Sequence, residues 1–325
     1  RIEQPIHELC PLCESDVRMA ADRCGIDSQL FLKSIRKEDA EGLAARPVTL
    51  FVLKEAFKKS GGCQGGVREL YRLGCTRLVD DWDPRRFESM RKASHPAQHV
   101  GSAERHKVAC RIAAVSLLTG RSIIFMGPSS QAAEGELTLS DLVGGPEPLG
   151  HNVFEVTEHH VFSALETALF SARGLNRVGF AHKTFAECMA AQYLTQMPLG
   201  QIRSLLCQRD GAGEHVVPQL AELAAWLAVE NAAFMRFLIE HDPVVLLRSD
   251  VEMAEDTVKF NLTEALLEGS RRGTVFDNVL GVRAYSGLRH DRLPDQLLRY
   301  ITGPDIDPLT KRMALDIASD CLLSE

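Results

Sequence analysis

Apolar residues recur every three to four positions over most of the chain, a pattern that predicts amphipathic helices. The first 100 residues contain four such segments, separated by polar and glycine-rich breaks. Ser15 and Ser28 are expected to cap the first two helices, since a serine oxygen accepts from the free N–H groups there. Pro47 is expected to begin the third, because proline lacks the N–H that a helix interior needs. The four predicted segments are 14–25, 28–39, 43–62 and 67–82.

Residues 101–196 combine helical patterns with short β-rich runs. A helical pattern precedes one strand-like run, and two more helical patterns follow it. Gly174-Leu175-Asn176 then separates two strand-like runs with residues that favour a tight hairpin turn. The order helix, strand, helix, helix and hairpin predicts a winged-helix domain. The segments are 104–120, 121–127, 138–144 and 158–172, then the hairpin, and a last helix within 179–194.

The last part of the chain, residues 197–325, contains amphipathic runs joined by Gly, Asp and Pro breaks, and no strand is predicted after Pro198. Stacked helix pairs of irregular length are expected, as in HEAT-type α-solenoids. Residues 271–291 are either a long connection or a further helix. The predicted fold class is therefore mainly α: a helical domain (1–100), a winged helix with a small β-hairpin (101–196) and a helical repeat region (197–325).

The stretch GFAHKTFAECMAAQYL, residues 179–194, begins as a strand and ends as a helix. Thr184 and Glu187 fit a capping box, which predicts that the helix begins at Thr184. Phe185, Met189 and Tyr193 then share one face, which is expected to be buried.

His182 would lie two residues ahead of this cap, at the end of the strand. Free N–H groups at a helix N-terminus favour anions, and an imidazole there can donate to a phosphate oxygen. The alternative is a loop histidine that is hydrogen-bonded to the backbone.

The formal net charge of −7 argues against a general binder of nucleic acids or membrane surfaces. No run reaches the roughly 18 apolar residues of a membrane span, and no signal peptide is visible. The chain has nine cysteines at irregular spacing, which favours a reducing, cytoplasmic setting over a disulfide framework. Because the sequence starts with Arg1 and not with methionine, we expect a segment of a longer polypeptide.

A metal site is not predicted. Cys10 and Cys13 form one CxxC pair, but no second pair follows at zinc-finger spacing. His95 and His99 form an HxxxH, but Pro96 between them disfavours a helix. Small buried thiols are the expected alternative for the cysteines.

Residues 178–194 resemble the end of the winged-helix domain in NACHT-type STAND NTPases, whose phrase has the form F-x-H-x-[ST]-F-x-E-[FY]-x-A-A-x-[YL]. The one departure is Cys188, where an aromatic residue is usual. In that family the histidine contacts the β-phosphate of bound ADP and locks the resting state, so the resemblance assigns this role to His182. The matching positions are Phe180, His182, Thr184, Phe185, Glu187, Ala190, Ala191 and Tyr193.

Residues 7–53 are similar to the helical domain that follows the NACHT ATPase core, and 67–71 resemble its next helix. The similarity rests on three short motifs. These are Leu9-Cys10-Pro11-Leu12 before the first helix, Gly25-Ile26 where that helix ends, and Arg46-Pro47-Val48-Thr49-Leu50. In relatives the proline packs on the adenine ring, so the resemblance gives that role to Pro47. Helix initiation alone is the other interpretation, and both can hold.

No G-x-x-x-x-G-K-[ST] phrase is present, so this segment is not expected to hydrolyse ATP. The resemblance implies that an upstream P-loop domain of the same chain binds ADP or ATP with Mg²⁺. The segment would hold the ADP-bound closed state, respond to a protein trigger on the helical array and permit homo-oligomerisation. A signalling role, such as bacterial antiviral defence, follows by analogy.

Two other functions remain open. The winged helix of a DNA-binding regulator would need cations on its recognition helix, and residues 159–170 contain none. A purely helical scaffold for protein partners would never contact nucleotide.

Overall fold

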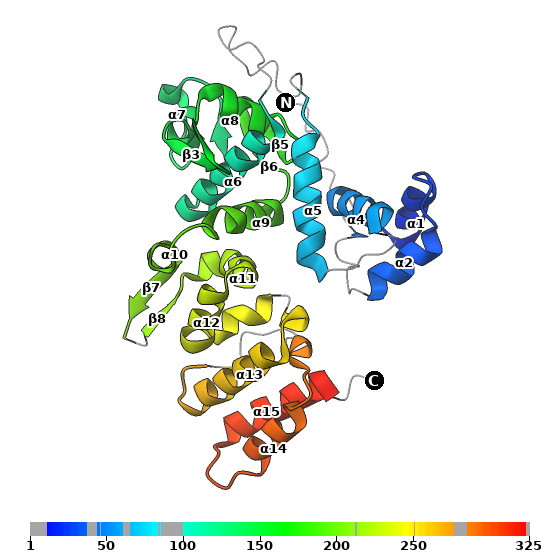
Figure 1. The fold of residues 1–325 in the computed structure, drawn as a ribbon, viewed down its shortest axis with the longest axis vertical. Coiled ribbons are helices and arrows are strands. Elements are labelled where there is room, and N and C mark those ends of the chain that lie inside the picture. Colours follow the sequence, from blue (N-terminus) through cyan, green and yellow to red (C-terminus); the bar gives the residue numbers. More distant parts are fainter. Residues whose placement is uncertain are drawn as a thin grey trace, which may run out of the picture.

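The computed structural model describes residues 12–37, 44–45, 47–60, 66–83, 85, 100–211, 213–249, 251–275 and 285–322. Helices dominate this part of the chain and the sheets are small, which confirms the mainly α prediction (Figure 1). The α-helices are α1 (Glu14–Asp22), α2 (Ser28–Lys37), α4 (Pro47–Ser60), α5 (Gly66–Asp80), α6 (Ser102–Thr119), α7 (Leu139–Leu142), α8 (Glu158–Leu165), α9 (Lys183–Leu194), α10 (Leu199–Leu206), α11 (Ala221–Glu230), α12 (Ala232–His241), α13 (Asp256–Arg271), α14 (Leu293–Thr302) and α15 (Pro308–Leu322). The 3₁₀ helices are η2 (Ser129–Gln131), η3 (Pro218–Leu220), η4 (Pro243–Arg248), η5 (Val251–Met253) and η7 (Ser286–Leu288). The strands are β1 (Ile124–Phe125), β2 (Leu137–Thr138), β3 (Pro146–Leu149), β4 (Asn152–Glu155), β5 (Phe170–Gly174), β6 (Arg177–Phe180), β7 (Cys207–Asp210) and β8 (Gly213–Val216).

The elements predicted for the middle of the chain occur in the expected order, but two further features lie among them: the short strand β2 and the β3–β4 hairpin. A four-stranded sheet has the order β2-β1-β6-β5, in which β1 and β2 are parallel and the other pairs are antiparallel. The β5–β6 hairpin turns at the predicted position, where Gly174 (φ 133°) and Asn176 (φ 54°) adopt positive φ. Helix α8 ends at Leu165 and is shorter than predicted, because the chain enters β5 five residues later.

Two hairpins were missed by the sequence analysis. Strands β3 and β4 pair between α7 and α8, and β7 and β8 pair after α10. The prediction of no strand after Pro198 is therefore wrong. Pro146 and Pro148 argue against a strand in the sequence, since proline is normally depleted in strands and tolerated only at edges, so the first hairpin was not predicted. The second is short, polar and largely exposed, so it lacks the alternating pattern of a half-buried strand.

Helix α5 joins two groups of buried side chains. Residues from α1, α2 and α4 form one cluster, to which α5 adds Leu70. A larger cluster contains Tyr71, Cys75 and other residues of α5 and continues through the winged helix to α15. Figure 1 shows α5 between α4 and the winged-helix elements, and it contacts both α4 and α9.

Two predicted caps in the first 100 residues are displaced. Helix α1 begins one residue before Ser15, with Cys13 as the N-cap, and the carboxylate of Asp16 accepts from Cys13 N (2.9 Å). At α2 the carboxylate of Asp27, not Ser28, accepts from the next free N–H groups (2.9 and 3.0 Å). A carboxylate suits both positions, because the positive end of a helix favours negative charge. Pro47 occupies the first position of α4, as predicted.

Candidate functional site

His182 is the N-cap of α9. Strand β6 ends at Phe180, and His182 has an extended backbone (φ −142°, ψ 141°) immediately before the first helical residue, Lys183. Its Nδ1 accepts from the backbone N–H of Thr184 at 3.2 Å. The predicted capping box is therefore wrong, because the imidazole takes the place expected of the Thr184 hydroxyl and the helix starts earlier.

Glu187 does not accept from the backbone N–H of Thr184, which donates to His182 instead. Its side chain is buried on the inner side of α9 and forms an ion pair with Lys183, one helical turn before it, at 3.1 Å. Burial raises the pKa of Glu187, and the Lys183 ammonium opposes this only in part. The predicted buried face of α9 is otherwise confirmed: Phe185 and Met189 are buried and Tyr193 is partly buried.

The hydrogen bond at Nδ1 determines which nitrogen of His182 can donate. Because Nδ1 accepts an N–H, the proton of a neutral ring lies on Nε2. This tautomer can donate to an anionic oxygen. The neighbouring cations are Lys183, whose side chain is exposed, and Arg173, whose guanidinium donates to the carbonyl oxygen of Phe180. Thr184 N–H, Lys183 and Arg173 already have partners within the chain, so the candidate donor to a phosphate at this helix N-terminus is the Nε2–H of His182.

A series of aromatic contacts leads from His182 to α5 and α11. The His182 ring lies edge-on to Phe185, with centroids 5.9 Å apart. Phe185 contacts Tyr71 of α5 (6.0 Å), and Tyr71 contacts Trp226 of α11 (5.6 Å). The Arg68 guanidinium lies 4.4 Å from the Trp226 ring centroid. The sequence analysis singled out His182 and Phe185 of this series, but not the contacts with Tyr71 and Trp226, because these join helices far apart along the chain.

Pro47 is the first residue of α4, and His182 immediately precedes α9. Both helices pack on α5. Pro47 is exposed at the start of α4, so its ring is available to a ligand as well as suited to helix initiation. Arg46 lies outside the described residues. Nothing in the fold assigns Pro47 an adenine contact, and that role stays a prediction.

Glu147 of β3 is the centre of a buried ionic group that the sequence analysis missed. It accepts from the Tyr193 hydroxyl (2.7 Å) and pairs with Arg111 (3.2 Å) and Lys107 (3.6 Å). Burial and the neighbouring Glu147 carboxylate raise the pKa of Tyr193. The group fixes the β3–β4 hairpin to α6 and α9, and so supports the helix that His182 caps.

The cysteines of the described residues are free thiols. Cys75, Cys110 and Cys188 are buried where α5, α6 and α9 meet, and burial raises the pKa of Cys75 and Cys110. Cys13 is exposed at the α1 N-cap, whereas Cys10, His95 and His99 lie outside the described residues. Over the described ranges, no three His, Cys, Asp or Glu side chains are placed to hold a metal ion.

No known protein-family model matches the chain, and a search of curated proteins finds no match. The family resemblance therefore rests on the motif residues alone. Within the described part of the chain, no helix has the length and apolar character needed to cross a bilayer.

Proposed function

We propose that this chain is the nucleotide-dependent switch segment of a NACHT-type STAND signalling ATPase. The observation that carries the proposal is the position of His182. It caps α9 directly after the wing hairpin, with Nδ1 occupied by the helix and Nε2 as donor. The motif resemblance assigns a phosphate contact to the same residue.

In this mechanism ADP and Mg²⁺ are bound by an upstream P-loop domain of the same chain. The Nε2 of His182 donates to a phosphate oxygen, and Pro47 packs on the adenine ring. These contacts favour the closed state over the open one, which is how a ligand biases a two-state equilibrium. A protein trigger on the helical array would favour nucleotide exchange and homo-oligomerisation. By analogy with the family, we propose a cytoplasmic role in bacterial antiviral defence. No catalytic residue is assigned to this segment.

The aromatic contacts suggest how a change at His182 could be transmitted to α5 and α11. Displacement of His182 would disturb Phe185, and through it Tyr71 and the Trp226 contact on α11. Because packed rings cannot be displaced singly without loss of contact, a change at the α9 N-terminus is coupled to α5 and to the start of the helical array.

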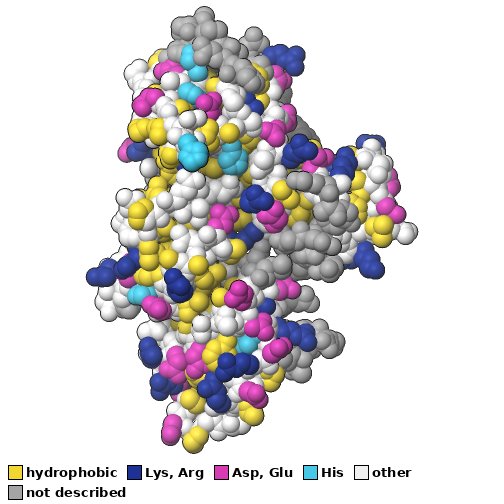
Figure 2. Space-filling model, viewed as in Figure 1, with side chains coloured by type: hydrophobic (Ala, Val, Ile, Leu, Met, Phe, Trp, Pro, Cys, Tyr) yellow, Lys and Arg dark blue, Asp and Glu magenta, His cyan; other side chains and the backbone are white. Residues whose placement is uncertain are grey.

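DNA binding is less well supported. The first turn of α8, the helix expected to enter the major groove, contains Glu158, and no Lys or Arg follows within the helix. On the wing, Arg177 pairs with Glu136 and Arg173 donates to backbone carbonyl oxygens. On the face drawn in Figure 2, basic and acidic side chains are interspersed over the lower part of the molecule. A phosphate backbone favours a basic surface instead.

The test compares two substitutions of His182 in the protein that includes its nucleotide-binding region. His182→Asn keeps an N-cap acceptor but removes the ring donor, whereas His182→Ala removes both. Loss of a hydrogen bond to a charged group costs about 1.5–3 kcal/mol, so His182→Asn is expected to speed ADP dissociation roughly 10- to 100-fold. If the asparagine variant retains ADP like the wild type, His182 is only a helix cap and the proposed latch is wrong.

A further inference from the structure

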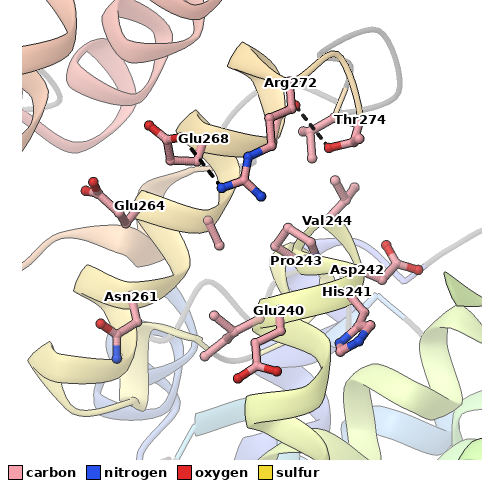
Figure 3. Close-up of a pocket in the computed structure, with 14 residues that line it drawn as sticks. Glu240, His241, Asp242, Pro243, Val244, Asn261, Glu264, Glu268, Arg272 and Thr274 are labelled. Atoms are coloured by element: carbon pink, nitrogen blue, oxygen red, sulfur yellow. Dashed lines mark hydrogen bonds and ion pairs between the residues drawn. The ribbon is translucent and has the colours of Figure 1, made fainter. Parts of the chain in front are cut away.

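The groove between α12 and α13 is lined by carboxylates that already have partners within the chain (Figure 3). Glu268 pairs with Arg271 (2.9 Å) and Arg272 (3.9 Å). Glu264 pairs with Arg299 (3.4 Å). These carboxylates need no external cation.

The β3–β4 hairpin, in contrast, has backbone groups without a partner. In an antiparallel pair of strands, residues that exchange both N–H···O bonds alternate with residues whose N–H and C=O point outward. Pro148 lies opposite Val153, and Pro146 lies opposite Glu155. Because proline has no N–H, these two pairs are of the outward kind. The N–H and C=O groups of Val153 and Glu155 therefore lie along the outer edge of β4.

The two edges of this hairpin differ. On the β3 side, Pro146 and Pro148 supply no N–H at the outward positions, so a further strand cannot complete its hydrogen bonds there. On the β4 side, the outward groups of Val153 and Glu155 have no hydrogen-bond partner within the described part of the chain. Val153 is also 67% exposed. An exposed edge with free donors and acceptors is a template for one more strand.

Contacts on the inner face hold this edge in position. Glu147 of β3 is fixed to α6 by Lys107 and Arg111. Phe154 of β4 packs on the ring of His160, the third residue of α8, with centroids 5.0 Å apart. The edge of β4 is therefore preformed, and a partner strand does not have to order it.

We propose that β4 pairs with β4 of a second copy of the chain, antiparallel and centred on Phe154. In this register Val153 of each copy lies opposite Glu155 of the other, and the two residues exchange both N–H···O bonds. A register centred on Glu155 would place two like charges opposite each other, which is destabilising. A register centred on Val153 would need the backbone of His151, which lies in the turn of the hairpin.

The side chains suit this two-fold arrangement. Phe154 of one copy would lie opposite Phe154 of the other at the non-hydrogen-bonded position, where aromatic pairs stabilise a sheet. Because β4 has only four residues, we expect a transient dimer with a Kd on the order of 10 µM. The inference does not depend on the proposed nucleotide switch, since neither His182 nor Pro47 takes part.

The test is sedimentation velocity of the 325-residue chain from about 1 to 100 µM at about 0.15 M salt. The wild type is expected to shift from monomer to dimer over this range. Val153→Pro removes an outward N–H and is expected to weaken the dimer about tenfold or more. Val153→Thr is the matched control, because it keeps the N–H and a β-branched side chain; a change below about twofold is expected.

Val153→Lys tests the register. It places an ammonium group opposite Glu155 of the other copy at two symmetric positions, so the dimer is expected to tighten several-fold. A misfolded variant would not show this gain. In a register centred on Val153 the same substitution would oppose two lysines and weaken the dimer.

Three results would overturn the proposal. A wild type that stays monomeric up to about 100 µM would show that a second copy does not occupy this edge. A dimer that Val153→Pro leaves unchanged would form through another surface. A dimer that Val153→Lys weakens would have a different register.

Discussion

Glu147 shows at the level of one residue how the winged-helix unit is held together. Its carboxylate is buried with two cations and a tyrosine hydroxyl around it. Lys107 and Arg111 lie on α6, Tyr193 lies on α9 and Glu147 itself lies on β3. Removal of one charge from such a group leaves the others buried without compensation, which costs more than the loss of one contact.

Glu147→Gln is therefore expected to lower the free energy of unfolding by about 3 kcal/mol. Urea denaturation followed by circular dichroism measures this. Glu14→Gln is the control, since Glu14 forms solvent-exposed pairs with Arg18 and Arg36 and its loss is expected to change stability far less than the loss of Glu147. Equal effects of the two substitutions would contradict the structural role of Glu147.

The site could be predicted from the sequence only in part. The position of His182 at a strand-to-helix junction followed from the apolar pattern, but its role as the cap did not, because histidine is not among the favoured N-cap residues. Glu187 fitted a capping box in the sequence, yet burial on the inner face of α9 gives it another partner. The ring contacts with Tyr71 and Trp226 depend on tertiary packing, which no local pattern encodes.

At the level of the element, one hairpin could be predicted from the sequence and another could not. Gly174-Leu175-Asn176 predicted the wing because its turn needs positive φ. Asp210-Gly211 is equally typical of a hairpin and could have revealed β7–β8, but the flanking residues are polar and do not alternate. What fixes this second hairpin is an ion pair: both nitrogens of the Arg203 fork donate to Glu214 (2.8 and 2.6 Å).

The stability of the β7–β8 hairpin is expected to depend on pH through Glu214. Arg203, with Arg209, lowers the pKa of Glu214 from 4.5 to about 2. A lowered pKa in the folded state adds stability above the unfolded pKa, and this stability is lost as pH falls from about 4.5 towards 2. Below pH 5 the melting temperature of the wild type should therefore fall more steeply than that of Glu214→Gln. Parallel melting curves for the two proteins over pH 7 to 3 would refute this.

At the level of the whole molecule, α5 joins the α1–α4 group to everything that follows. Val52 of α4 contributes to the larger cluster and Leu70 of α5 to the smaller one, so the two cores meet at the α4–α5 contact. The helices approach closely because position 74 has no side chain. A methyl group at Gly74 would lie 2.3 Å from Cγ1 of Val52.

Gly74→Ala is expected to destabilise the chain by about 1–3 kcal/mol, because the clash outweighs the better helix propensity of alanine. Val52→Ala removes the clashing methyl groups, so the double variant should be more stable than the sum of the two single changes predicts. A double-mutant cycle by urea denaturation measures the difference. Strictly additive effects would show that α4 and α5 do not meet at this point.

The proposed switch requires that His182 respond to nucleotide bound by an upstream P-loop region of the same protein. Hydrogen–deuterium exchange of the backbone amides in residues 179–194, with and without ADP, tests it most directly. We predict slower exchange at the α9 N-terminus when ADP is bound to the wild type, and loss of this protection in His182→Asn. Identical exchange with and without ADP in the wild type would contradict the account.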